Sequence, residues 1–181
     1  MSPPDPPAPP TQADRRPKPV YTFRPVTAED LPMLHHWLEQ PHLRGWWGDP
    51  ERGVSGLAHG LGHDPIDMRI VELHGDPFAY IQDHDVHEWP APQFSDLPDG
   101  ARAIDTFLGN AAFLGQGHAT GYLKQRAREL LAAGAARVAV DPDPENERAI
   151  AAYARAGFRG IRICRRADRS RARVMVFLDP G

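Results

Sequence analysis

The chain has 181 residues, a formal net charge of −3 and a single cysteine. This length suits one domain with one core, the charge excludes a generally basic nucleic-acid or membrane-surface protein, and the lone cysteine excludes an internal disulfide. The sequence contains neither an apolar run of membrane-spanning length nor the apolar core of a signal peptide, so we expect a cytoplasmic protein.

Residues 1–19 contain eight prolines and almost no apolar side chains. Such a segment cannot bury enough apolar surface to offset the entropy lost on ordering, so we expect a disordered, proline-rich tail. A proline-rich ligand for a partner protein is the alternative. Residues 20–181 are expected to form the folded domain.

The folded part begins with an alternating stretch at residues 21–26 that predicts a strand. A helix is predicted after it, to about Glu39, with apolar residues at the three-and-four spacing of one buried face. Thr27, with an acid three residues later, predicts the N-cap of this helix. Because Pro32 is tolerated only near a helix start, Asp30 is the alternative cap.

Two adjacent tryptophans, Trp46 and Trp47, follow in a loop. Two neighbouring large rings are not expected to face one core together, so we expect at least one of them to border a cavity or solvent. The alternative is that both rings close the end of the core.

The middle of the chain predicts a β-hairpin. Residues 68–73 and 77–84 each read as a strand, and the intervening residues 74–76 are a turn signal. Residues 49–66, before the hairpin, predict at most one short helix. The loop at 90–100 is rich in Pro and Asp, and a loop of this length inside a compact domain is usually functional or mobile.

A glycine-rich turn leads from a predicted strand at residues 102–108 into a helix that extends to about Leu131. Gly115 and Gly117 let a ligand approach the backbone closely, and the unpaired N–H groups of a first helical turn favour phosphate oxygens. The glycine spacing matches neither a Rossmann fingerprint nor a P-loop. A plain glycine-rich loop before a packed helix is therefore the alternative.

The last part of the chain predicts a helix among three strands. Asp143 is the expected N-cap of this helix, with Pro144 at its first position, and Gly157 is its expected end. The strands are predicted at residues 137–140, 159–165 and 173–178. This order of elements predicts a mixed α/β fold with one central sheet.

Four stretches carry a resemblance to a known family. They are HWLEQPHLRGWWG at residues 36–48, AYIQ at 79–82, RAIDTFLG at 102–109 and DPDPENERAIAAYARAGF at 141–158. Together with the glycine-rich turn, they resemble the GNAT superfamily of acetyltransferases, and within it the aminoglycoside 6'-N-acetyltransferases of type I. The resemblance implies a GNAT fold, with a single mixed central β-sheet flanked by helices.

The resemblance also implies acetyl-CoA as co-substrate, with its pyrophosphate held by the turn at residues 114–120. Leu114 stands where the family usually has Gln or Arg, which leaves backbone N–H groups to hold the phosphates. Asn146 is implied beside the pantetheine arm, and Tyr153 beside the thioester sulfur, where a tyrosine can protonate the departing thiolate. A helix cap for Asn146 and a core aromatic for Tyr153 are the alternatives. The expected acetyl-CoA contacts are Ile104, Thr106, Leu114, Gly115, Gln116, Gly117, His118, Ala119, Thr120 and Asn146.

Acetyl transfer to an amine requires a neutral amine aimed at the carbonyl, so an alkylammonium must first lose a proton. In resembling enzymes, positions matching Asp105 and Asp141 contact this amine. We expect Asp105 to be the general base, directly or through a water, and Asp141 to be an electrostatic anchor. Strand-end carboxylates that cap turns are the alternative. The expected acceptor contacts are Trp47, Gln82, Asp83, Trp89, Asp105 and Asp141.

Acidic side chains between flat aromatic walls suit a polycationic, hydroxylated ligand. We therefore expect an N-acetyltransferase that acts by direct attack in a ternary complex, with the 6'-amine of an aminoglycoside as the first acceptor. A siderophore precursor of the lysine or hydroxylysine type and a non-catalytic CoA-binding module are the alternatives. Cys164 lies outside the motifs, which argues against a cysteine relay.

We expect no metal site, because His84 and His87 have the spacing of half a zinc site and nothing supplies the other half. His84 is instead a candidate to assist the amine, since a histidine titrates near neutral pH. The expected partners are the amine and acetyl-CoA, with neither nucleic acid nor membrane. A monomer or a homodimer is expected.

Overall fold

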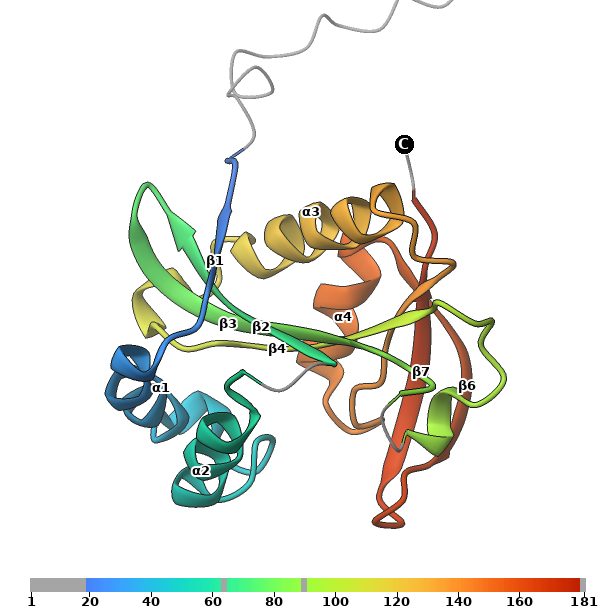
Figure 1. Ribbon diagram of the computed structural model, residues 1–181, viewed down its shortest axis with the longest axis horizontal. Helices are drawn as coiled ribbons and strands as arrows, with labels where there is room; N and C mark the ends of the chain where they lie inside the picture. Colours follow the sequence, from blue (N-terminus) through green and yellow to red (C-terminus); the bar gives the residue numbers. More distant parts are fainter. Residues whose placement is uncertain (1–18, 63–64, 89–90, 180–181) are drawn as a thin grey trace, which may run out of the picture.

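A computed structural model describes residues 19–62, 65–88 and 91–179 of the chain. These residues form one mixed sheet of seven strands in the order β1-β2-β3-β4-β5-β7-β6, flanked by four α-helices (Figure 1). The predicted mixed α/β fold with one central sheet is confirmed. The predicted tail lies outside the described residues, apart from Pro19. None of the described helices combines the length and the apolar character needed to cross a membrane.

The elements have the following bounds. The strands are β1 (Thr22–Pro25), β2 (Ile66–Leu73), β3 (Asp76–Asp85), β4 (Arg102–Leu108), β5 (Val138–Val140), β6 (Phe158–Arg165) and β7 (Arg171–Phe177). The helices are α1 (Leu31–Leu38), α2 (Pro50–Gly60), α3 (His118–Ala132) and α4 (Glu147–Ala156).

The two faces of the sheet bury different clusters of side chains. Helices α1 and α2 cover one face, where Tyr80 and Phe107 pack against Leu34 (Figure 1). Helices α3 and α4 cover the other face, where Ile81 and Ile104 are buried. Because successive residues of a strand point to opposite faces, the alternating strand pattern supplies both cores at once.

The start of α4 differs from the sequence-based expectation, and the start of α1 matches the alternative cap, Asp30. Helix α4 begins after Asn146, whose Oδ1 accepts a hydrogen bond from the Ala149 N–H at 3.0 Å. Asp143, the expected cap, instead accepts from the Glu145 N–H at 2.8 Å and closes a turn before the helix. At α1, Thr27 caps a short 3-10 turn and Asp30 directly precedes the α-helix.

The loop before β4 is packed onto the sheet from Ala91 onward. Phe94 is 1% exposed and lies in a third buried cluster with Leu97 and Val174. A buried aromatic side chain fixes the loop in place. The polar residue beside it, Gln93, is thereby held against the end of β5.

Strands β4 and β5 separate after a short parallel ladder. Only two pairs join them, Arg102 with Val138 and Ala103 with Ala139. The N–H of Arg102 points to the β5 side, where it donates to the Arg137 carbonyl oxygen at 2.8 Å. By the two-residue period of a strand, the N–H of Thr106 points to the same side, beyond the ladder. The resulting fork positions the candidate site.

Candidate active site

Two cavities meet where β4 and β5 separate. One, of about 740 Å³, lies against the start of α3 and is called the α3 pocket. The other, of about 690 Å³, lies against the turn of the β6–β7 hairpin and is called the hairpin pocket. The residues that line both are Trp46, Trp47, Thr106, Asn146, Ala149 and Tyr153. Two ligands could therefore meet beside these shared side chains.

The glycine-rich turn forms one wall of the α3 pocket. Gly115 and Gly117 have φ values of 75° and 83°, which L side chains rarely adopt, and α3 begins directly after them at His118. The first-turn residues Ala119 and Thr120 also line the pocket. The glycine-rich turn thus leads into a helix start that lines the cavity, as the sequence predicted. The first N–H groups of a helix have no intrahelical acceptor, and this arrangement favours phosphate oxygens.

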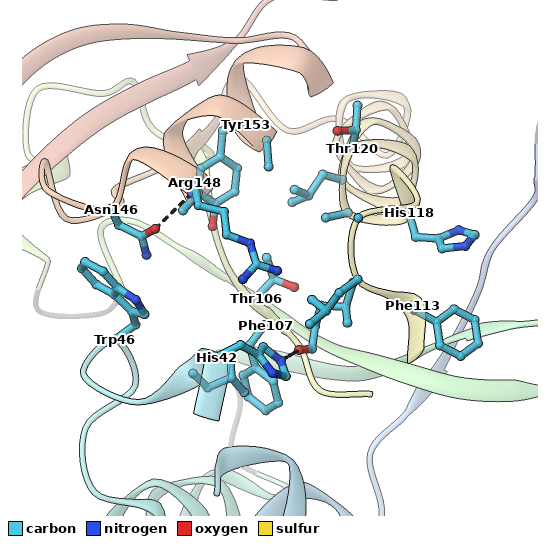
Figure 2. A pocket seen from close by; sticks show the side chains of 18 of the residues that line it. His42, Trp46, Thr106, Phe107, Phe113, His118, Thr120, Asn146, Arg148 and Tyr153 are labelled. Atoms are coloured by element: carbon cyan, nitrogen blue, oxygen red, sulfur yellow. Dashed lines mark hydrogen bonds between the residues drawn. The ribbon is translucent and has the colours of Figure 1, made fainter. Parts of the chain in front are cut away.

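Side chains of the turn are arranged less uniformly than the sequence suggested. Leu114 lines the α3 pocket. Gln116 does not line it, because its side-chain amide donates to the Ala112 carbonyl oxygen. The His118 ring is turned toward Phe113 (Figure 2), and its Nδ1 lies 3.1 Å from the Tyr21 hydroxyl.

Arg148 is a pocket residue that the sequence analysis missed. Figure 2 shows its side chain reaching from the first turn of α4 into the α3 pocket. A cation here would complement a phosphate-bearing ligand. Arg148 lies in the first turn of α4 only because the helix begins after Asn146. With the expected cap at Asp143, Arg148 would lie in the second turn.

Four carboxylates line the hairpin pocket, and two of them, Asp105 and Asp141, are each held by an amide side chain. Asp105 accepts a hydrogen bond from Gln82 Nε2 at 3.0 Å, and Asp141 accepts one from Gln93 Nε2 at 3.0 Å. Asp141 also forms an ion pair with Arg166, with Nε 2.8 Å from Oδ2. Asp105 and Asp141 line the pocket as expected, whereas Gln82, also an expected contact, lines neither pocket and instead contacts Asp105. No sequence signal pointed to Gln93 or Arg166.

Burial changes how these groups titrate. Burial raises the pKa of Asp105 above that of an ordinary carboxyl, although the bond from Gln82 opposes the shift. Burial, and then the charge of Asp105, raise the pKa of Asp141 to about 6 against the pull of Arg166. A pair of carboxyls with raised pKa values is a typical proton-handling arrangement.

Tyr153 and Asn146 lie where the two pockets meet. Burial raises the pKa of Tyr153 well above its ordinary value, so its hydroxyl keeps its proton at neutral pH. Asn146 is the N-cap of α4, and it lines both pockets as well. Ile104 lines the hairpin pocket, and Thr106 lines both.

The tryptophan pair divides as the sequence predicted. Trp47 packs against Phe107, with ring centroids 4.8 Å apart, and lines both pockets. Trp46 also lines both and is 47% exposed. The alternative, that both rings close the end of the core, is wrong.

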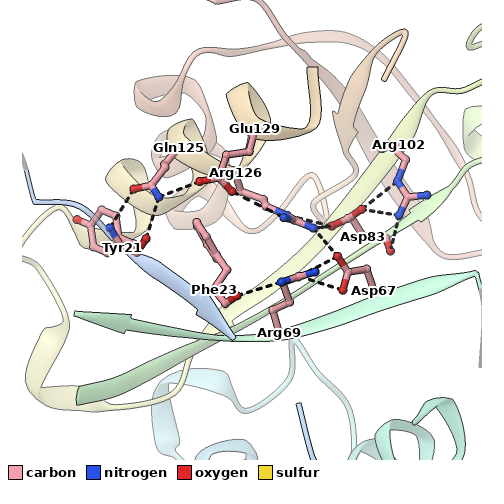
Figure 3. A network of polar contacts seen from close by, with 9 residues as sticks. All are labelled: Tyr21, Phe23, Asp67, Arg69, Asp83, Arg102, Gln125, Arg126 and Glu129. Atoms are coloured by element: carbon pink, nitrogen blue, oxygen red, sulfur yellow. Dashed lines mark hydrogen bonds and ion pairs between the residues drawn. The ribbon is translucent and has the colours of Figure 1, made fainter. Parts of the chain in front are cut away.

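Asp83 is not at the pocket, which corrects the sequence-based expectation. It is 1% exposed and accepts hydrogen bonds from Arg126 and Arg102 within a polar network (Figure 3). The physical reason is strand alternation. The Gln82 side chain contacts Asp105, which lines the hairpin pocket, so the neighbouring Asp83 points to the opposite face, under α3. Trp89, another expected contact, lies outside the described residues.

His84 lines the hairpin pocket from β3. Burial lowers the pKa of His84, which favours the neutral imidazole. Its part in assisting an amine stays a prediction. Among the described residues, no group of three or more His, Cys, Asp or Glu side chains is arranged to hold a metal ion.

Comparison with known proteins places the chain among acetyltransferases. Residues 26–165 match the acetyltransferase (GNAT) domain family. The chain is 32% identical over 146 residues to the type 1 aminoglycoside N(6')-acetyltransferases of Klebsiella pneumoniae and Serratia marcescens, covering 76% of this chain and 73% of each relative.

Solved structures agree with the sequence relatives. The structure of AAC(6')-Ib with paromomycin and acetyl-CoA is similar with a TM-score of 0.76 and 29% identity, over 87% of this chain and 92% of that one. The complex of AAC(6')-Ib with coenzyme A and kanamycin gives a TM-score of 0.75 and 29% identity, over 87% and 94%. The chain therefore belongs to the GNAT family of acetyltransferases, and the type 1 aminoglycoside N(6')-acetyltransferases are its relatives within that family.

Proposed function

We propose that this protein transfers the acetyl group of acetyl-CoA to the 6'-amine of an aminoglycoside, by direct attack in a ternary complex. The observation that carries the proposal is the meeting of the two pockets at Tyr153 and Thr106. One pocket has a helix start suited to phosphate oxygens, and the other is lined by the carboxylates of Asp105 and Asp141 among others. The kinship with aminoglycoside 6'-acetyltransferases supports the choice of acceptor.

Acetyl-CoA would occupy the α3 pocket. Backbone N–H groups at the start of α3 would hold its pyrophosphate, and Arg148 would add a charged contact. The N–H of Thr106, which points into the fork, is placed to donate to the thioester oxygen as negative charge develops there. This oxygen site would be made from the backbone, so it does not depend on the identity of one side chain.

The acceptor would occupy the hairpin pocket, with its amine toward the fork. Asp105 takes a proton from the ammonium, directly or through a water, and the neutral nitrogen then attacks the carbonyl carbon. The carbon–sulfur bond breaks, and the departing thiolate receives the proton of the Tyr153 hydroxyl. The proton that the newly acylated nitrogen loses then restores this hydroxyl. Trp47 supplies a flat wall against which a sugar ring can pack.

The proposal includes a cytoplasmic location, which the free Cys164 favours because reducing compartments keep thiols reduced. It also includes a monomer or a homodimer, which sedimentation velocity would determine.

Release of CoA thiol from acetyl-CoA tests the activity. Kanamycin and tobramycin are the acceptors, with lysine, hydroxylysine and no acceptor as comparisons. We expect release with the two aminoglycosides alone. Release only with lysine or hydroxylysine would favour a siderophore-type acceptor, and no release with any amine despite acetyl-CoA binding would favour a non-catalytic module.

Asp105→Asn tests the proposed base. We expect kcat to fall at least about 100-fold, because general base catalysis contributes on that scale, with acetyl-CoA affinity unchanged. The measurements are steady-state kinetics with kanamycin and calorimetric titration with acetyl-CoA. Equal losses in both quantities would mean that Asp105 supports the fold rather than the reaction.

A further inference from the structure

Arg166 follows β6, and its guanidinium contacts four groups of the protein itself. Nε donates to Asp141 Oδ2 at 2.8 Å, and Nη2 donates to the Asp141 carbonyl oxygen. Nη1 donates to Ser170 Oγ at 3.2 Å and to the Arg171 carbonyl oxygen at 2.8 Å. The Arg166 side chain thus joins the hairpin turn to the end of β5.

A fixed cation is unexpected in a pocket proposed to take a positively charged ligand. The side chains of Arg166 and Asp141 are only 26% and 10% exposed, so solvent screens their charges weakly. Asp105 differs, because its hydrogen bond comes from the neutral amide of Gln82. Of these two carboxylates, Asp105 alone lacks an ion pair within the described part of the chain.

Arg166 is poorly suited to bind a carboxylate of the acceptor. Its Nε, Nη1 and Nη2 all donate to oxygens of the protein, so little of the guanidinium fork is left for a bidentate ligand. Besides Arg166, Asp105 and Asp141, the charged or titratable groups that line the pocket are His84, Asp143, Tyr153 and Asp168. The effect of Arg166 on a ligand is therefore that of its charge.

We propose that Arg166 is a specificity-determining residue of the acceptor site, which offsets the charge of Asp141 and so limits the positive charge that the pocket accepts around the reacting amine. This inference rests on the proposed function. The reacting amine pairs with Asp105, while any further ammonium group near Asp141 meets a carboxylate already held by Arg166.

The test compares Arg166→Gln and Arg166→Lys with the unchanged protein on two acceptors. Kanamycin carries several amines, and 6-amino-6-deoxyglucose carries one. Arg166→Gln removes a cation, so we expect the KM for kanamycin to fall about tenfold relative to that for the monoamine. Arg166→Lys keeps the charge and should keep the ratio of the two KM values, even where both rise. In about 0.5 M NaCl the change in ratio should shrink, because salt screens charges.

Arg128→Gln is the matched control, since Arg128 forms an exposed ion pair with Asp179 and lines neither pocket. The double variant Arg166→Gln/Asp141→Asn leaves no unpaired charge, so it serves where the single variant does not fold. We expect its KM ratio to return toward that of the unchanged protein.

Three results separate the outcomes. The inference is overturned if the ratio of the two KM values is the same in Arg166→Gln as in Arg128→Gln. It is also overturned if Arg166→Lys or the double variant shifts this ratio as much as Arg166→Gln does. Transfer to both acceptors with an unchanged ratio contradicts this inference alone. No transfer to either acceptor by the unchanged protein contradicts the proposed function, and this inference with it.

Discussion

Tyr153 is the side chain whose chemistry and packing are hardest to separate. Its hydroxyl lies in a buried position shared by the two pockets, and its ring packs on Phe158 with centroids 5.8 Å apart. We expect Tyr153→Phe to lower kcat by about tenfold or more, because the thiolate loses its proton donor, while the ring contacts stay. Steady-state kinetics should find the acceptor KM unchanged, and the melting temperature reports on packing. An unchanged kcat would return Tyr153 to the core.

The pH dependence follows from Asp141. Because its pKa is about 6, it is charged above that pH and takes up a proton as the pH falls through it. Asp105, with a pKa also raised, changes in the same direction. We therefore expect kcat/KM for kanamycin to fall on the acid side of about pH 6, measured over roughly pH 5 to 8. In Asp141→Asn this acid limb should move to lower pH, because Asp105 is then the carboxyl that titrates and it no longer has a negative charge beside it. An unmoved limb would exclude Asp141 as its source.

Single residues also mark how far sequence reasoning reached. The positions of Asp105, Asp141 and Tyr153 in the pocket walls were predictable, because each residue lies in a stretch that resembles a known family. Asp83 was wrongly expected at the acceptor site because it is acidic. Its position next to Gln82 on a strand, which turns it to the opposite face, was not considered. Arg166 was not predictable, since it lies far along the chain from Asp141 and only the hairpin brings them together.

At the scale of elements, the start of α3 depends on a glycine. Gly117 is the N-cap with a φ of 83° and lines the α3 pocket, and an added Cβ would meet no other protein atom within 4 Å. Gly134, just after α3, has a φ of 103° and equally open space. We expect Gly117→Ala and Gly134→Ala each to cost about 1 kcal/mol of unfolding free energy, because alanine is strained there.

Only Gly117→Ala should weaken the binding of acetyl-CoA, by about tenfold, because any adjustment of the backbone there moves the N–H groups that would hold the phosphates. Urea unfolding and calorimetric titration check the two quantities. If Gly134→Ala weakened acetyl-CoA as much, the effect would be one of general stability.

Element types were more predictable than their ends. The hairpin of β2 and β3, the helix α3 and the closing β6 and β7 were all expected, because periodicity and turn residues are local signals. The start of α4 was not, because Asp143 and Asn146 are both good caps and the choice between them depends on how the chain leaves β5. That choice also fixed the position of Arg148.

At the scale of the whole molecule, one polar network ties the sheet to α3. Asp83 accepts from Arg126 at 2.6 Å and from Arg102 at 2.5 Å, and Arg126 also pairs with Asp67 at 2.6 Å (Figure 3). We expect Arg126→Met to cost about 3 kcal/mol of unfolding free energy, since it leaves Asp83 buried with one partner fewer.

Arg128→Met removes an exposed pair from the same helix and should cost under about 1 kcal/mol. Urea unfolding gives both values, and kcat/KM of the folded fraction should be unchanged in each. A similar cost for the two variants would mean that the buried network adds no more than a surface pair.

The fork between β4 and β5 has a consequence for how such an enzyme tolerates mutation. Under the proposed function, acetyl-CoA is gripped largely by main-chain groups of β4 and of the start of α3, which side-chain replacement leaves in place. The acceptor pocket is lined by side chains from β3, from β4, from the residues after β5 and from the hairpin turn, each replaceable on its own. Single substitutions can thus redirect the molecule to a new amine while its acetyl donor stays the same.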